Sequence, residues 1–147
     1  MENVSTRDFT VAVFVMWQNQ TLLHKHKKLD MWLPCGGHIE PDELPDEAAV
    51  REVLEESGVD VELIGEKVLD ISDPVQLVRP RGIQLESISE RHEHIDLIYF
   101  ARPLKSYAGY LLDSDPSLGW YSQDDCRTLG LNEEITKWLE LLWTELT

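Results

Sequence analysis

Apolar positions recur along this chain with two different periods, and each period predicts a different element. Residues 8–17 (DFTVAVFVMW) and 94–104 (HIDLIYFARPL) are rich in β-branched and aromatic residues, which is typical of strands. Residues 45–57 and 132–147 space their apolar residues as amphipathic helices do. Shorter extended segments are predicted at residues 21–24, up to Gly36 and Gly37, in parts of 59–71 and 74–88, and at 119–122. This order predicts an α/β sandwich with a mixed sheet.

The boundaries of the predicted helices carry recognisable signals. Pro45 suits a first helical position, where its missing N–H is not needed, and Gly58 suits a left-handed stop. Ser122 with Asp125 predicts a capping box before a short helix, and Asn132 is a cap candidate for the last helix.

The helix at 45–57 gathers three carboxylates in one sector. At about 100° per residue, Glu52, Glu55 and Glu56 share roughly 100° of the surface, although like charges at i, i+4 repel by a few tenths of a kcal/mol. No lysine lies at a spacing that would offset them. Ala48 leaves room beside them, and the predicted core face consists of Ala49, Val50, Val53 and Leu54. The spacing alone leaves two interpretations open, a solvated acidic face and a site for a hard cation such as Mg²⁺ or Mn²⁺.

The charge balance narrows the class of partner. The chain of 147 residues has 13 lysines and arginines against 28 aspartates and glutamates, a formal net charge of −15. Because duplex nucleic acid is bound mainly by neutralising phosphates, a duplex nucleic-acid binder is disfavoured, and so is an anionic-membrane binder. A small phosphorylated ligand stays compatible if divalent cations reverse the local field.

The expected location is the cytoplasm. No run approaches the 18 apolar residues of a membrane span, and the first residues (MENVSTRDF) lack the basic start and apolar core of a signal peptide. Cys35 and Cys126 lie far apart without clustered ligands, which disfavours a zinc–thiolate site and, in a reducing compartment, a disulfide.

Residues 37–59 resemble the Nudix box. Gly37, five residues, Glu43, seven residues and then REVLEESGV (51–59) match that pattern without a gap or substitution. The order of the remaining segments is similar to that of a whole Nudix (MutT-like) hydrolase, so residues 1–147 are expected to form a single domain of this type. The resemblance implies a mixed-sheet α/β/α sandwich. It also implies Mg²⁺- or Mn²⁺-dependent hydrolysis of a nucleoside diphosphate linked to another group.

The same resemblance implies roles for the box residues. Glu52 and Glu56 would bind the metal, Glu55 would be a further ligand or activate water, and the Gly37 carbonyl can complete the coordination.

Two further box residues, Arg51 and Glu43, resemble the family's internal ion pair, which orients the ligands. Leu44 stands where relatives often have Ser or Thr, and we expect this to weaken the helix N-terminus slightly.

The general base is not fixed by the box. Glu55 is the first candidate and Glu93 the second, with Glu90 beside it. His92 and His94 suggest a metal site, but we expect them to lie just before a strand without a third ligand, solvated or touching substrate.

Four cationic or imidazole side chains, Lys28, His38, Arg79 and Arg81, are candidate substrate contacts. The alternative is that they are ordinary exposed charges.

The leading substrate is a nucleoside triphosphate, cleaved to a monophosphate and pyrophosphate. The alternatives are an ADP-ribose or nucleotide-sugar pyrophosphatase and a nucleotide sensor that does not hydrolyse its ligand, although such sensors usually lose box glutamates. A homodimer is compatible with tryptophans exposed on the last helix.

Overall fold

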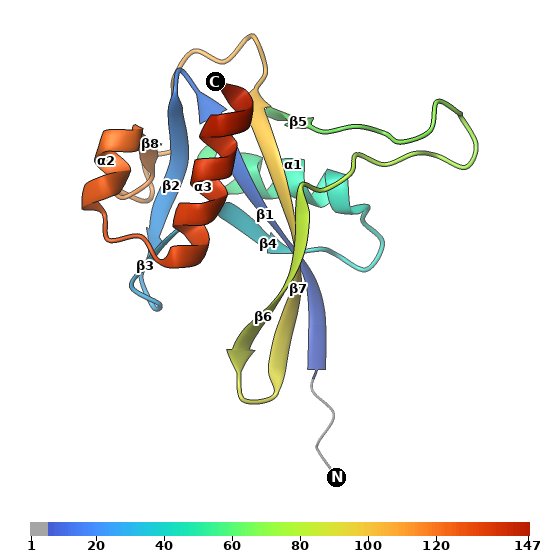
Figure 1. Cartoon of the computed structure of the whole chain (residues 1–147), viewed down its shortest axis with the longest axis horizontal. Coiled ribbons are helices and arrows are strands. Elements are labelled where there is room, and N and C mark those ends of the chain that lie inside the picture. The colour runs from blue at the N-terminus through green and yellow to red at the C-terminus, as the bar shows by residue number, and fades with distance from the viewer. Residues whose placement is uncertain (1–5) are drawn as a thin grey trace.

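A mixed sheet built around two long parallel strands organises residues 6–147, which are the residues that the computed structural model describes (Figure 1). β1 (Thr6–Trp17) runs parallel to β7 (His92–Pro103), with Thr6 opposite His92 and Val15 opposite Ala101. All other pairings are antiparallel. Beside β1 lie β4 (Cys35–His38) and β2 (Gln20–His26), beside β7 lie β5 (Val61–Ile64) and β6 (Gly82–Ser89), and β2 pairs with β3 (Met31–Leu33) and β8 (Gly119–Tyr121).

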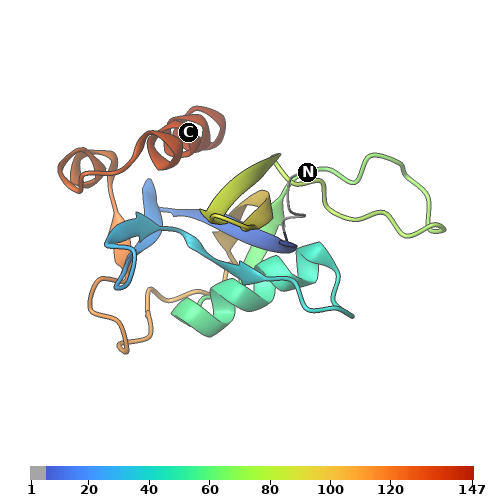
Figure 2. The same ribbon diagram turned by 90° about the horizontal axis from the view of Figure 1, so that it is seen from below.

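Helices cover both faces of this sheet (Figure 2). α1 (Pro45–Ser57) lies on one face, and α2 (Gln123–Thr128) and α3 (Glu133–Leu146) lie on the other. The predicted α/β/α sandwich with a mixed sheet is therefore confirmed. None of the helices within residues 6–147 is long and apolar enough to cross a membrane.

The apolar run of β1 reflects burial on both faces. Val11, Val13 and Val15 pack in the core under α1, whereas Phe14 and Met16 pack in the core under α3. A strand covered on both sides needs apolar residues at successive positions, so it shows a continuous run rather than an alternation.

The start and end of α1 lie at the predicted residues. The helix begins at Pro45, and Gly58 follows it with φ of 79°. Leu44 offers no side-chain cap, but its backbone N–H donates to Glu47 Oε1 at 3.0 Å, so one end of the helix is still stabilised. Ser122 and Asn132 cap α2 and α3 as predicted.

The predicted core face of α1 is partly wrong. Leu54 is 45% exposed, whereas Ala48, which we had placed beside the glutamates, is fully buried. The buried residues are Ala48, Ala49, Val53 and Ser57. The centre of the buried face is thus shifted toward Glu52 and Glu56, which puts these carboxylates against the sheet.

Three other expectations can be compared with residues 6–147. Trp143 is buried and Trp138 packs against Phe14 and Phe100, so the tryptophans of α3 give no support to a homodimer, which stays a prediction. Residues 65–81 form no strand, and the strands on either side are β5 and β6. The signal-peptide expectation depends partly on residues 1–5, which lie outside the described residues, and the cytoplasmic location stays a prediction.

Candidate active site

The sheet approaches α1 closely at Gly37. This residue lies in β4, opposite Val11 of β1, and it faces the middle of the helix. A Cβ on Gly37 would lie 2.6 Å from the Glu52 carboxylate, which is closer than real Cβ contacts. Glycine therefore lets the Glu52 side chain lie directly against the strand.

Glu56 lies beside Glu52, one turn further along the same side of α1. Its Oε1 accepts a hydrogen bond from the Gly36 N–H at 2.7 Å, and its side chain is only 31% exposed. Burial, helped by the neighbouring charges of Glu52 and Glu55, raises the pKa of Glu56 to about 7. Burial also raises the pKa of Glu52.

Arg51 offsets the repulsion between the helix carboxylates. Its guanidinium donates to both oxygens of Glu43, from Nε at 2.6 Å and from Nη2 at 2.8 Å. Nη1 donates to Glu52 at 2.9 Å and to Glu55 at 3.2 Å, and Nη2 also donates to the His38 carbonyl at 3.0 Å. These hydrogen bonds hold the pKa of Glu43 below its usual range. One arginine thus joins the loop before the helix, the end of β4 and two box glutamates.

The donor set fits a hard divalent cation. The half-buried carboxylates of Glu52 and Glu56 are the oxygen ligands that Mg²⁺ and Mn²⁺ prefer, and Glu55, 59% exposed, stands at the rim. A cation between them would favour their ionised forms, which burial opposes. In the structure one carboxylate oxygen of Glu52 and one of Glu55 accept from Arg51 Nη1.

The loop before α1 and the helix itself line a groove of about 480 Å³ beside Glu55. Its walls are Glu40, Asp42, Glu43, Glu47, Arg51 and Glu55. A second groove of about 560 Å³ adjoins it, and Glu40 and Glu43 line both.

The geometry can be compared with known proteins. A family profile described as NUDIX domain matches residues 6–141. The chain belongs to the Nudix hydrolase family. It is similar to a crystal structure of a NUDIX-family hydrolase from Clostridium perfringens, with a TM-score of 0.76 and 32% identity over 97% of this chain and 99% of that one. The MutT protein from Bacillus halodurans, at 23% identity and a TM-score of 0.61 over 90% of this chain and 78% of that one, supports the fold alone.

The curated relatives match over shorter stretches. A Bacillus subtilis (strain 168) protein provisionally named an 8-oxo-dGTP diphosphatase is 43% identical over 58 residues, which is 37% of this chain and 39% of that protein. Diphosphoinositol polyphosphate phosphohydrolase 3-alpha from Mus musculus is 63% identical over 30 residues, 20% of this chain and 18% of that one. The matches thus span less than half the length of these relatives. The resemblance to Nudix hydrolases, enzymes that act on pyrophosphate bonds, is confirmed at the level of the family.

Two side chains outside the predicted set of ligands lie beside the Nudix box. His24 of β2 places Nε2 3.7 Å from Glu56 Oε2 and Nδ1 3.7 Å from Asp115 Oδ2. Burial lowers the pKa of His24, against the opposing effect of Asp115. The sequence HKHKK (24–28) is typical of a basic loop, but its first three residues belong to β2. Asp115 comes from an irregular segment whose position cannot be read from spacing.

The predicted substrate contacts are dispersed. Lys28 lies in the turn between β2 and β3, and Arg79 is exposed and paired with Glu66 at 3.1 Å. Arg81 pairs with Glu145 of α3 at 2.8 Å, on the face of the sheet opposite α1. Arg81, directly before β6, is thus directed toward α3, and its role as a substrate contact stays a prediction.

The remaining substrate candidate, His38, contributes to the lining of the groove of about 560 Å³, although it projects from the side of the sheet away from α1. Its Nε2 lies 3.2 Å from Asp8 Oδ2, and its ring lies against His94. The expectation that His92 and His94 precede a strand and lack a third ligand is wrong, because both lie in β7 and Asp8 is beside them. Burial and the neighbouring His38 and His92 lower the pKa of His94.

Glu55 and Glu93 remain the two predicted candidates for the general base. Glu93 lies in β7 and accepts from Arg7 Nε at 2.8 Å, whereas Glu55 stands at the rim of the acidic groove. We expect Glu55→Gln to lower kcat by about 10²–10⁴-fold and to abolish the acidic limb of the kcat–pH profile. Glu93→Gln should cost less than about tenfold, because its loss leaves the box intact. The reverse order of the two effects would assign the base to Glu93.

Proposed function

We propose that this protein is a divalent-metal-dependent pyrophosphohydrolase whose substrate is a nucleoside triphosphate, converted with water to a nucleoside monophosphate and pyrophosphate. The observation that carries the proposal is the complete set of box glutamates, with Glu52 against Gly37 and with Arg51 joining Glu43, Glu52 and Glu55. A sensor that does not hydrolyse its ligand would have no need for all of them.

The chain's own residues would divide the work as follows. Glu52 and Glu56 would hold the Mg²⁺ or Mn²⁺ together with the Gly37 carbonyl, and Glu43 fixes Arg51 so that the ligands keep their orientation. When bound, the cation neutralises phosphate charge and lowers the pKa of a water molecule. Glu55 takes the proton from the water that adds to phosphorus, and the P–O bond of the bridging oxygen breaks.

The groove beside the box supports a nucleotide substrate. It is about 560 Å³ in volume, the size of a small-molecule site, and its lining combines the exposed ring of Phe9 and the side chain of Leu97 with Arg7. An aromatic ring beside a cationic side chain suits the nucleobase of a nucleotide together with its phosphate groups. The similarity to the Bacillus subtilis protein named for 8-oxo-dGTP favours a nucleoside triphosphate over ADP-ribose or a nucleotide sugar, the second candidate class.

The test is a release assay on a panel of substrates with Mg²⁺ or Mn²⁺. The panel holds unmodified and oxidised nucleoside triphosphates, ADP-ribose, nucleotide sugars and dinucleoside polyphosphates. Inorganic pyrophosphatase converts pyrophosphate released from the triphosphates to detectable phosphate, and for the other substrates alkaline phosphatase releases phosphate from the monophosphate products. We expect turnover of a nucleoside triphosphate, retained by Glu140→Gln, an exposed glutamate of α3, and lost in Glu56→Gln. Turnover of ADP-ribose or nucleotide sugars alone would move the proposal to the second class. Nucleotide binding without turnover would overturn the enzymatic assignment.

A further inference from the structure

Four side chains that can bind metal converge where β1, β7 and β4 lie side by side. Asp8 is opposite His94 in the parallel pairing of β1 with β7, and His38 is opposite Thr10 in the pairing of β1 with β4. Residues two apart in a strand share a face, so Asp8, His38, His92 and His94 all project from one side of the sheet. That side is opposite α1 and the Nudix box.

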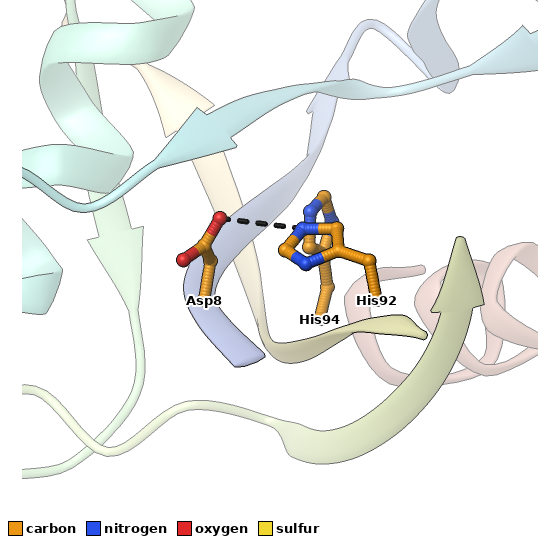
Figure 3. Close-up of side chains that lie close together, drawn as sticks. All are labelled: Asp8, His92 and His94. Carbon is orange, nitrogen blue, oxygen red and sulfur yellow. Dashed lines mark ion pairs between the residues drawn. The ribbon is translucent and has the colours of Figure 1, made fainter. Parts of the chain in front are cut away.

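The spacing of the ligand atoms suits one small ion. Asp8 Oδ2 lies 3.3 Å from His92 Nε2 and 3.2 Å from His38 Nε2. The His94 ring lies 5.0 Å from that of His92 and 5.1 Å from that of His38, centroid to centroid. A tetrahedral ion with metal–nitrogen bonds of about 2.0–2.1 Å has ligand atoms about 3.3–3.4 Å apart. Figure 3 shows Asp8, His92 and His94 directed toward one another.

This group is unusual within residues 6–147. Asp8, His92 and His94 are the one set of three acidic, histidine or cysteine side chains there whose ligand atoms all lie within 4.8 Å of one another. The box glutamates do not form such a set.

The hydrogen bonds of His92 leave one ring nitrogen facing the carboxylate. Thr6 Oγ1 donates to the Arg91 carbonyl at 3.2 Å and lies 2.8 Å from His92 Nδ1. The Thr6 hydroxyl thus fixes the orientation of the ring through Nδ1, and Nε2 faces Asp8 Oδ2 at 3.3 Å. A second partner on the other ring nitrogen is also how metal-binding histidines are oriented.

We propose that Asp8, His92 and His94, together with His38, form a binding site for a divalent transition-metal ion of the Zn²⁺ class. Imidazole-rich sites select Zn²⁺, Ni²⁺ or Cu²⁺, whereas Mg²⁺ prefers oxygen alone, so this site and the box differ in the cation they take. The ion would join the first residues of β1 and β7 to the end of β4. There the His38 carbonyl accepts from Arg51 Nη2, so the ion would also fix the strand end next to Gly37.

The experiment uses the untagged chain, stripped with EDTA, dialysed and kept in excess Mg²⁺ so that the box cannot take up the second metal. Calorimetric titration with Zn²⁺ should show one ion per chain. Co²⁺ should give the intense visible absorption of a four-coordinate site. At Zn²⁺ a hundred times above Kd, Tm should rise by about 5–10 °C.

Variants decide whether the ion is bound by these residues. His94→Gln and Asp8→Asn should each weaken Zn²⁺ binding at least tenfold, since even indirect supporting groups contribute about 10–100-fold. His26→Gln, a histidine of β2, and Glu56→Gln should bind as the unaltered chain does. Thermal unfolding in EDTA checks that each variant folds. If His94→Gln does not fold, the Zn²⁺ affinity of Asp8→Asn, a substitution at an exposed position, tests the proposal. Absence of stoichiometric Zn²⁺ binding, equal binding by Asp8→Asn, or loss confined to Glu56→Gln would each overturn the proposal.

Discussion

Glu56→Gln is expected to abolish Mg²⁺-dependent turnover and, in the absence of metal, to make the protein more stable. The loss of turnover should exceed about 10²-fold, because a metal ligand matters at least as much as the groups that orient it. The fold should be retained, since the amide oxygen of the variant can still accept from the Gly36 N–H.

The gain in stability follows from the raised pKa of Glu56. Its pKa is about 7 in the folded chain and 4.5 as the ordinary value, so between these pH values the folded state binds more protons than the unfolded one. The free energy of unfolding therefore falls as pH rises from about 4.5 to 7. Above pH 7 the ionised, buried carboxylate destabilises the folded state by the full free-energy equivalent of the pKa difference. With allowance for the partial exposure of the side chain, that difference is about 1–3 kcal/mol.

Urea unfolding in EDTA checks this expectation. At pH 8 Glu56→Gln should be more stable than the unaltered chain, and at pH 4.5 the two should be nearly equal, because Glu56 is then protonated in the folded state and half protonated in the unfolded one. Saturating Mg²⁺ should stabilise the unaltered chain and the control Glu140→Gln but not Glu56→Gln. A variant that is less stable in EDTA at pH 8, or that retains turnover, would show that Glu56 is not a desolvated ligand.

The sequence predicted the fold because its strongest signals are local or repeated. β1 and β7 are buried on both faces, so each appears as an apolar run, and α1 carries its own start and stop at Pro45 and Gly58. The Nudix box was also predictable, since a loop and one helix contain it. Helical spacing placed Leu54 on the wrong face, because the sheet meets α1 from the side of Glu52 and Glu56.

Contacts between distant strands were not predictable in this way. Asp8 meets His94 only because β1 and β7 are parallel and in one particular register, and a shift of one residue would send Asp8 to the other face. The same holds for His24, which reaches Glu56 because β2 ends beside the box. The position of Arg81 was not predictable for the same reason, since it follows from the pairing of the adjacent β6 with β7 and not from its charge.

Substituting alanine for each of the two adjacent glycines of β4 should have different effects on stability and turnover. At Gly37 the new Cβ would meet the Glu52 carboxylate at 2.6 Å, and this flexible group can move aside. We expect Gly37→Ala to fold, to lose about 1–2 kcal/mol of stability, and to lose about 10²-fold in turnover because Glu52 is displaced from its position. The Mg²⁺ concentration for half-maximal activity should rise as well.

At Gly36 the new Cβ would meet the Val11 carbonyl oxygen at 2.2 Å, and backbone cannot turn aside without breaking the pairing of β1 with β4. Gly36→Ala should therefore cost about 3 kcal/mol or more of stability, seen in urea unfolding as a large fall in the midpoint. Wild-type stability in Gly36→Ala would contradict the close packing of β4 on β1. Unaltered turnover and Mg²⁺ dependence in Gly37→Ala would contradict the placement of Glu52 against β4, and with it the geometry on which the proposed metal site depends.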